Sequence, residues 1–336
     1  MFRPIFFMFS YRQFTAIAGA VYPDEYEAFL SKMTAINLDI GFILSSLCII
    51  ETDFYDRLLV STTWPLVVFS ALSGVSFITR NMNRSTDVAE PIVQRKHLAA
   101  GLFVLFLVYS SVSFTIFQTF VCEDLDDGNA YLRADYSVQC WTEKHDWYRT
   151  YAGVMVCVYP VGIPAFFGWW LARNRQQLNK PDRQPTPHLL SFRGLWSAYK
   201  PSCYYYEVVE CSRRILLTGA AVFVLPNTPD QIAVVLLVAV IFMFISESLS
   251  PFENNHDMWL YRWGNAVVLM SMYVALVLKV ELAGDESRIL LVMTTVLVVA
   301  NVFMIASVFV RAVLLVKGLC LSRRVEDVHS APSTFV

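Results

Sequence analysis

The strongest constraint in this sequence is a series of apolar runs, each about as long as a helix needs to cross a bilayer, roughly 20 residues. Charged side chains make up only 16 % of the 336 residues, against about 25 % in an average soluble protein. A soluble fold of this size would need a much larger polar surface. The sequence therefore predicts an all-α, polytopic membrane protein embedded in the lipid bilayer of the plasma membrane or an endomembrane.

Seven apolar segments are predicted to span the membrane: 58–79, 98–120, 151–172, 211–225, 231–249, 263–279 and 288–316. A weaker run at 4–20, which Arg12 and Gln13 interrupt, brings the expected number to eight, with seven as the alternative. The same N-terminal run also fits a cleaved signal peptide, because Ala18-Gly19-Ala20 follows it. The apolar segment 36–50 is too short to cross the bilayer easily, so we expect an interfacial or re-entrant helix there.

Basic residues between the spans predict the orientation, because Lys and Arg are enriched in cytoplasmic loops. The segments predicted to lie inside contain Arg80, Arg84, Arg95, Lys96, Arg173, Arg175, Lys180, Arg183, Arg193, Lys200, Lys317, Arg323 and Arg324. The segments predicted to lie outside, 21–57 and 121–149, contain only Lys32, Arg57, Arg133, Lys144 and Arg149. With eight spans, both termini are cytoplasmic. The chain then consists of a multi-pass domain, 1–316, and a short cytoplasmic tail, 317–336.

Two cysteines, Cys122 and Cys140, bracket an acidic segment of the second outer loop. In an oxidising exterior, a disulfide closing a loop of this length contributes about 3 kcal/mol, although two unrelated thiols remain the alternative. Four acidic residues lie close after Cys122: Glu123, Asp124, Asp126 and Asp127. We found no C-x-x-C pair and no Cys/His zinc spacing, so the sequence predicts neither a metal site nor a cofactor.

A charged segment enters the predicted span at 211–225 from its cytoplasmic side. Glu207, Glu210, Arg213 and Arg214 are spaced three or four residues apart and therefore share one helix face. Charge near hydrocarbon is expensive and usually functional. Two interpretations stay open: a collar of interfacial charges that reach toward water, or a buried ionic latch that fixes the cytoplasmic ends of the bundle and takes part in gating.

The span at 151–172 contains two prolines around a glycine, Pro160, Gly162 and Pro164. Each proline removes a backbone donor and clashes with the preceding turn, so the helix must kink or unwind here. The kink is either a static packing feature or a hinge that lines a cavity.

Other polar features have simpler explanations. Asn265 and Asn301 lie inside predicted spans, where hydrogen bonds between helices satisfy their amides. The chain ends in Thr334-Phe-Val336, a pattern that fits a PDZ-domain groove. The sequence lacks the H-E-x-x-H, G-x-S-x-G, Walker and G-x-G-x-x-G motifs, so we expect no enzyme. Nothing in it indicates nucleic-acid binding.

Several blocks, taken in order, resemble a known family. They are Asn37-Leu-Asp39, Cys48, Pro65, Phe120-Val-Cys122, Tyr131-Leu-Arg-Ala-Asp135, Cys140, Tyr159-Pro-Val-Gly-Ile-Pro164, Tyr205-Tyr-Glu207, Glu210-Cys-Ser-Arg-Arg214, Gln231 and Pro251-Phe252. This order is similar to the multi-pass domain of TRP-like (transient receptor potential-like) proteins of fungi and other unicellular eukaryotes. The resemblance covers about residues 5–282.

The resemblance implies a cation channel, with cations and a second copy of the chain as expected partners. A TRP pore needs a re-entrant loop, and the outer links 226–230 and 280–287 are too short to form one. Residues 36–50 or the acidic outer loops would then contribute to the pore. The alternatives are a non-conducting receptor-like or scaffold module and, third, a transporter whose broken helix at 151–172 binds substrate.

The predicted topology can be checked by glycosylation mapping. A sequon added between Glu123 and Asp135 should acquire a glycan, because that loop is expected to face the lumen or exterior. The native sequon at Asn83 should stay unmodified, and the reverse pattern would overturn the orientation.

Overall fold

The fold is taken from a computed structural model that describes residues 53–82, 90–125, 128–183, 186–219, 229–280 and 292–307. The isolated positions 26, 28, 223, 309, 310, 313 and 314 are described as well. The predicted segments 4–20 and 36–50 and the tail 317–336 lie outside the described residues. So do Cys48, Asn83, Asp126, Asp127, Thr334 and Val336.

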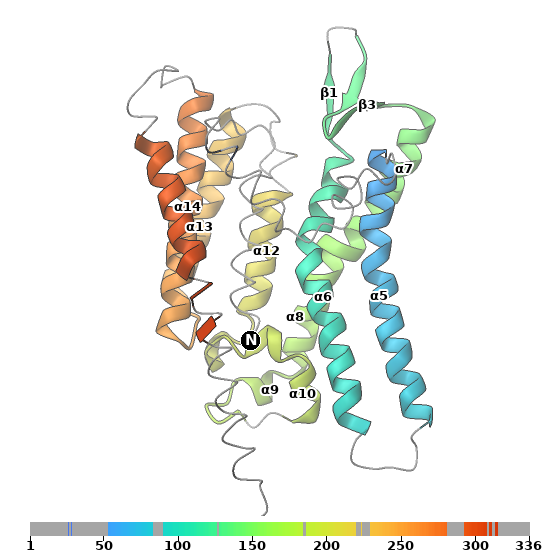
Figure 1. Ribbon diagram of the computed structural model, residues 1–336, viewed down its shortest axis with the longest axis vertical. Coiled ribbons are helices and arrows are strands. Elements are labelled where there is room, and N and C mark those ends of the chain that lie inside the picture. Colours follow the sequence, from blue (N-terminus) through green and yellow to red (C-terminus); the bar gives the residue numbers. More distant parts are fainter. Residues whose placement is uncertain are drawn as a thin grey trace, which may run out of the picture.

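Among the described residues, four helical segments are long and apolar enough to cross a membrane: Phe54–Val75, Glu143–Arg173, Asp230–Leu249 and Asn255–Lys279. They coincide with the runs predicted at 58–79, 151–172, 231–249 and 263–279. The prediction of a helical integral membrane protein is therefore confirmed. In Figure 1, three of the segments belong to α5 (Phe54–Met82), α13 (Pro229–Leu249) and α14 (Asn255–Lys279). The segment Glu143–Arg173 consists of α7 (Glu143–Val156) and the helical turns that continue it to Arg173.

The prediction of eight spans is not confirmed by these helices. The run at 98–120 forms α6 (Glu90–Gln118), which bends by 40° between Phe106 and Val108 and adds a fifth candidate if it is one span. The run at 211–225 overlaps α12 (Tyr206–Thr218), which begins five residues before the run and is 13 residues long. In the predicted span 288–316, the structure describes a helix over Val292–Ser307.

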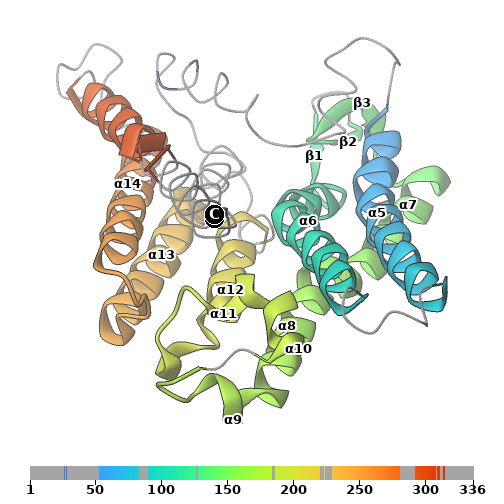
Figure 2. The same cartoon turned by 60° about the horizontal axis from the view of Figure 1, so that its bottom comes forward.

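The helices form two groups with separate apolar cores. In the first group, α5 packs along α6, and both contact the chain that runs from α7 to α8 (Ile163–Arg173). In the second, α13 packs along α14, and side chains of Val292–Ser307 join their core. Both Figure 1 and Figure 2 show α12 between the two groups. Its Cys211 belongs to the first core and its Leu217 to the second.

A small antiparallel sheet, which the sequence did not predict, follows α6. Its strands are β1 (Cys122–Asp124), β2 (Ala130–Leu132) and β3 (Asp135–Gln139), paired in that order. Cys122 faces Leu132 across the first pair, and the register shifts between Tyr131 and Leu132 in the second. The sheet forms a ribbon at one end of the molecule.

At the opposite end, the basic segment between α8 and α12 forms a series of short helices (Figure 1). They are α9 (Arg175–Leu178), α10 (Pro187–Ser191), α11 (Arg193–Trp196) and the 3₁₀ turn η2 (Pro201–Cys203). Two of them begin with proline, whose missing N–H costs nothing in a first turn. The acidic ribbon and this basic cap thus lie at opposite ends of the bundle (Figure 1), and which end faces the cytoplasm stays a prediction.

The predicted kink is a π-helical turn, η1 (Cys157–Gly162), between α7 and α8. Pro160 lies inside the turn, where its missing N–H leaves a gap in the hydrogen-bond ladder of the helix. Pro164 occupies the first turn of α8, where a proline is also tolerated. The Tyr159 hydroxyl donates to the Thr62 carbonyl of α5 at 2.6 Å, which anchors the break to the neighbouring helix.

Two glycines of this span should respond to alanine in opposite ways. A Cβ at Gly162 would lie 2.6 Å from the carbonyl oxygen of Cys157, so Gly162→Ala must shift the backbone of the π turn. We expect a loss of about 1–3 kcal/mol in the free energy of unfolding. A Cβ at Gly153 meets nothing within 4 Å, so Gly153→Ala should be neutral or stabilising by up to about 1 kcal/mol. Unfolding in detergent, followed by circular dichroism, measures both. Equal effects would contradict the requirement for glycine in the π turn.

Candidate functional site: a buried charge cluster on α12

The start of α12 is fixed by pairing between the loop that precedes it and the loop that joins α13 to α14. Lys200 N–H donates to the Pro251 carbonyl at 2.8 Å, and Glu253 N–H donates to the Ala198 carbonyl at 3.1 Å. These bonds bring the rings of Tyr199 and Phe252 together, with centroids 5.2 Å apart. Helix α12 therefore begins against α14, the helix that follows the second loop.

Four charged side chains of α12, named here the α12 charge cluster, are buried together. They are Glu207, Glu210, Arg213 and Arg214, and their exposed fractions are only 1–4 %. A collar of interfacial charges would leave the charged groups in water. The burial favours the latch interpretation on this point, whereas its role in gating stays a prediction.

Glu210 is the centre of the cluster. Arg213 Nε donates to its Oε2 at 2.9 Å and Arg213 Nη2 to its Oε1, so this pair is bidentate. Arg214 Nε donates to Oε1 at 3.3 Å, and the Tyr261 hydroxyl of α14 donates to Oε2 at 2.9 Å. One carboxylate thus accepts from two cations and a phenol, which compensates the large cost of burying its charge.

Glu207 has fewer partners. Its Oε2 accepts from the Tyr199 hydroxyl at 2.7 Å, while its Oε1 accepts no hydrogen bond from the described residues. Arg183, in the basic cap, holds Tyr199 in place by donating to the Tyr199 carbonyl at 2.8 Å. Burial lowers the pKa of the Arg183 guanidinium, which also stacks over Trp196.

The arginines and the backbone extend the cluster to both helix groups. The Arg213 guanidinium lies 5.8 Å from the ring centroid of Tyr261 on α14, and that of Arg214 lies 5.4 Å from the ring of Phe106 on α6. The Tyr109 hydroxyl of α6 donates to the Cys211 carbonyl of α12 at 2.9 Å. The cluster therefore reaches α6 in the first group and α14 in the second, while α12 as a whole also packs against α8 and α13.

The two predicted intramembrane amides are both buried. Asn301 Nδ2 donates to the Tyr26 hydroxyl at 3.1 Å, and that hydroxyl shares a hydrogen bond of 3.0 Å with Ser271 of α14. Such bonding between segments is the role expected for Asn301. Asn265 lies on α14 and is not part of the α12 charge cluster.

The predicted disulfide between Cys122 and Cys140 is confirmed, and it ties β1 to the end of β3. Glu123 and Asp124 lie in β1 rather than in an irregular loop. Glu123 accepts a hydrogen bond of 2.8 Å from the Tyr136 hydroxyl, which raises the pKa of Tyr136. Asp124 is exposed.

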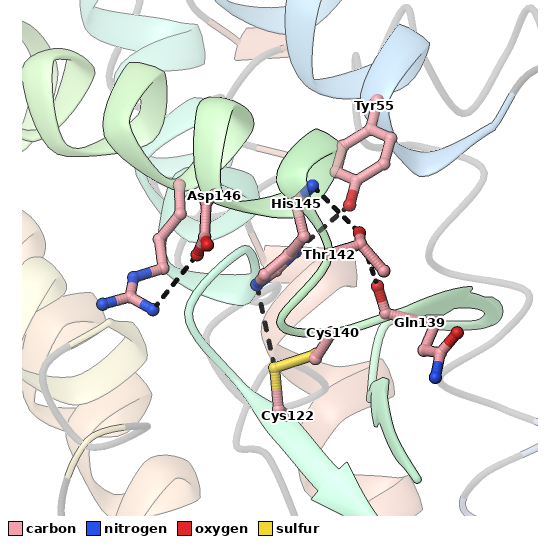
Figure 3. The surroundings of a disulfide bond; sticks show 8 residues. Tyr55, Cys122, Gln139, Cys140, Thr142, His145 and Asp146 are labelled. Carbon is pink, nitrogen blue, oxygen red and sulfur yellow. Dashed lines mark hydrogen bonds and ion pairs between the residues drawn. A yellow bond between two sulfur atoms is a disulfide. The ribbon is translucent and has the colours of Figure 1, made fainter.

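The surroundings of the disulfide contain a histidine that sequence reasoning missed (Figure 3). His145 Nε2 lies 3.8 Å from Cys122 Sγ, and its Nδ1 lies 3.1 Å from the Tyr55 hydroxyl of α5. Thr142 caps α7 by accepting from His145 N–H at 3.2 Å, which fixes the first turn. Tyr199 and Tyr261 were also missed, because they lie 8 and 51 residues from their carboxylate partners.

Comparison with known proteins gives limited guidance. No family model matches the chain, and no solved structure matches it. Over 216 aligned residues, the chain is 25 % identical to Cysteine repeat modular protein A of Toxoplasma gondii. The alignment covers 58 % of this chain and 6 % of that protein, so the chain spans a small part of the relative's length. The resemblance to TRP-like proteins stays a prediction.

The burial of Glu210 predicts a large effect of its removal. Glu210→Ala leaves two buried guanidinium groups without their carboxylate, so we expect a loss of about 3–5 kcal/mol in the free energy of unfolding. Glu247→Ala is the matched control, because Glu247 pairs with Arg262 at 2.7 Å and the two side chains are 41 % and 52 % exposed. The control should cost about 0–1 kcal/mol. Denaturant unfolding in detergent measures both, and similar losses would contradict a buried, paired Glu210.

Proposed function

We propose that this chain is the membrane part of a TRP-like cation channel, in which α12 couples two helix groups. The observation that carries the proposal is the α12 charge cluster, which is buried and contacts both α6 and α14. The coarser statement, that the chain is an integral membrane protein, rests on its four apolar helices.

A buried ion pair is a poor way to hold two helix groups in one fixed arrangement, because well-packed apolar residues of similar volume are often at least as stable. Ionisable groups inside a membrane are therefore a default indication of function. Directional bonds such as those from Tyr261 and Tyr199 have discrete broken and formed states. In the proposed channel, α12 changes partners at these bonds when the two helix groups move.

Two further features support conduction. The π turn at Cys157–Gly162 interrupts the regular hydrogen-bond ladder of a candidate span and can serve as a hinge, and π turns are frequent at functional sites. At the outer end, Glu123 and Asp124, together with Asp126 and Asp127, would raise the local concentration of cations.

The proposed pore forms between copies of the chain in the bilayer. Helix α13 leaves large apolar side chains exposed, among them Leu237, Ile241 and Phe244, which would contact lipid or a second copy. The C-terminal Thr334 and Val336 would bind a PDZ-domain protein on the cytoplasmic side. Residues 36–50 would contribute the re-entrant part of the pore.

A second candidate is a receptor-like module that does not conduct. The ribbon favours it, because a disulfide-closed element exposes Tyr136 and the neighbouring Trp141 at the outer end. Exposed aromatic side chains of this kind are enriched in protein interfaces. The relative with which the chain shares similarity is also far longer than the aligned part.

Planar bilayers reconstituted with the purified chain distinguish the two candidates. Under voltage steps and membrane stretch, we expect unitary, cation-selective currents. The double variant Glu210→Gln, Arg213→Gln should change the open probability about 5- to 150-fold, the range of typical coupling energies.

The matched control is Glu247→Gln, Arg262→Gln, which removes an exposed pair of the same composition and should leave gating unchanged. Silence from a monodisperse, reconstituted wild-type sample would reject the channel in favour of the receptor-like module. Currents that respond equally to both double variants would reject the role of the α12 charge cluster.

A further inference from the structure

Three potential metal-ligand atoms converge at the outer end of α7. The sulfurs of Cys122 and Cys140 and one imidazole nitrogen of His145 all lie within 4.8 Å of one another. Cys140 and His145 are nearly fully buried, and Cys122 is partly buried. In Figure 3, the imidazole points at the disulfide from the first turn of the helix.

The imidazole is oriented as it is in many metal sites. A metal-bound histidine usually donates its second ring N–H to an oxygen, which leaves the other nitrogen free to coordinate. Here Tyr55 Oη lies 3.1 Å from Nδ1, so that Nδ1–H donates to the hydroxyl in the matching tautomer, and Nε2 faces Cys122 Sγ at 3.8 Å. Tyr55 is itself held by stacking on Tyr148, with ring centroids 4.0 Å apart.

We propose that reduction of the Cys122–Cys140 disulfide turns the two cysteines and His145 into a binding site for Zn²⁺ or a similar thiophilic divalent cation. The ligands are the two thiolates and His145 Nε2, with a water molecule in the fourth position. This set of two sulfurs and one nitrogen suits Zn²⁺, which prefers tetrahedral coordination by cysteine and histidine.

The chemistry balances in two steps. A dithiol reductant transfers two electrons and two protons to the S–S bond, giving two thiols, and leaves as its own disulfide. Cation binding then displaces the two thiol protons to solvent, because the thiolate is the ligand form. The disulfide and the metal site exclude each other, since the same two sulfur atoms make both.

The required movement is small. Ligand bonds of about 2.3 Å to sulfur and about 2.0 Å to nitrogen place tetrahedral ligand atoms roughly 3.5–3.8 Å apart. The Nε2–Sγ distance to Cys122 already has this value, and the two sulfurs need only separate after the bond breaks. The sequence alone does not indicate the site, because Cys140 and His145 are adjacent to Cys122 only after the ribbon folds.

Binding of Co²⁺, a visible substitute for Zn²⁺, tests the proposal on the full chain in detergent. After reduction with a phosphine and desalting, the wild type should bind one equivalent more than Cys122→Ser, Cys140→Ser, with a thiolate-to-cobalt charge-transfer band. This variant keeps the other five cysteines and so corrects for their binding. His145→Ala should weaken Co²⁺ binding at least tenfold, and the unreduced wild type should lack the band.

A second measurement needs no variant. Zn²⁺ should slow the alkylation of Cys122 and Cys140 in the reduced wild type, as read by peptide mass spectrometry, relative to the same sample with a chelator. Equal Co²⁺ uptake by the reduced wild type and the double serine variant would overturn the proposal. Alkylation that Zn²⁺ leaves unchanged at both cysteines would overturn it as well. Neither outcome depends on ion conduction.

Discussion

A carboxylate in an apolar interior persists only where cations and hydrogen-bond donors replace the lost water, and Glu210 meets this condition through its neighbours. Arg213, Arg214 and Tyr261 all donate to it. Tyr261 reaches it from another helix, so satisfying this one charge requires α14 to lie against α12. The loop pairing through Lys200 and Pro251 then sets the two helices in register. The placement of this single charge therefore constrains how α12, α14 and the two loops pack together.

The same constraint explains why the two helix groups are joined differently from the way each is built. Within a group, α5 packs on α6 and α13 on α14 through continuous apolar contacts, which are non-directional. Between the groups, α12 adds bonds that depend on angle as well as distance, such as those from Tyr109 to the Cys211 carbonyl. Apolar cores deform little, whereas directional bonds switch between discrete partners.

The sequence predicts the features that depend on local spacing. A span of about 20 apolar residues identifies α5, α13 and α14, and the i, i+3 and i, i+4 spacing identifies the shared face of Glu210 and Arg213. The disulfide follows from two cysteines at the ends of an outer loop. Features that depend on distant chain segments are not predicted. Tyr261 lies 51 residues from Glu210, and nothing near either residue indicates the contact. The strands β1 and β2 contain three residues each, too few for a periodic pattern.

The span that the π turn interrupts, from α7 to α8, runs from the disulfide at one end of the molecule to the basic cap at the other. Helix α7 carries His145 in its first turn, beside the disulfide, and α8 ends at the basic cap. In the middle of α8, a Cβ at Gly168 would lie 3.8 Å from Val208 of α12. Between α7 and α8, η1 is held to α5 by the bond from Tyr159 to the Thr62 carbonyl. Because this bond fixes the π turn to α5, the first helix group holds the middle of the broken span, while α8 beyond it lies against α12. The disulfide and the α12 charge cluster are therefore linked through a single interrupted helix that α5 holds at its break.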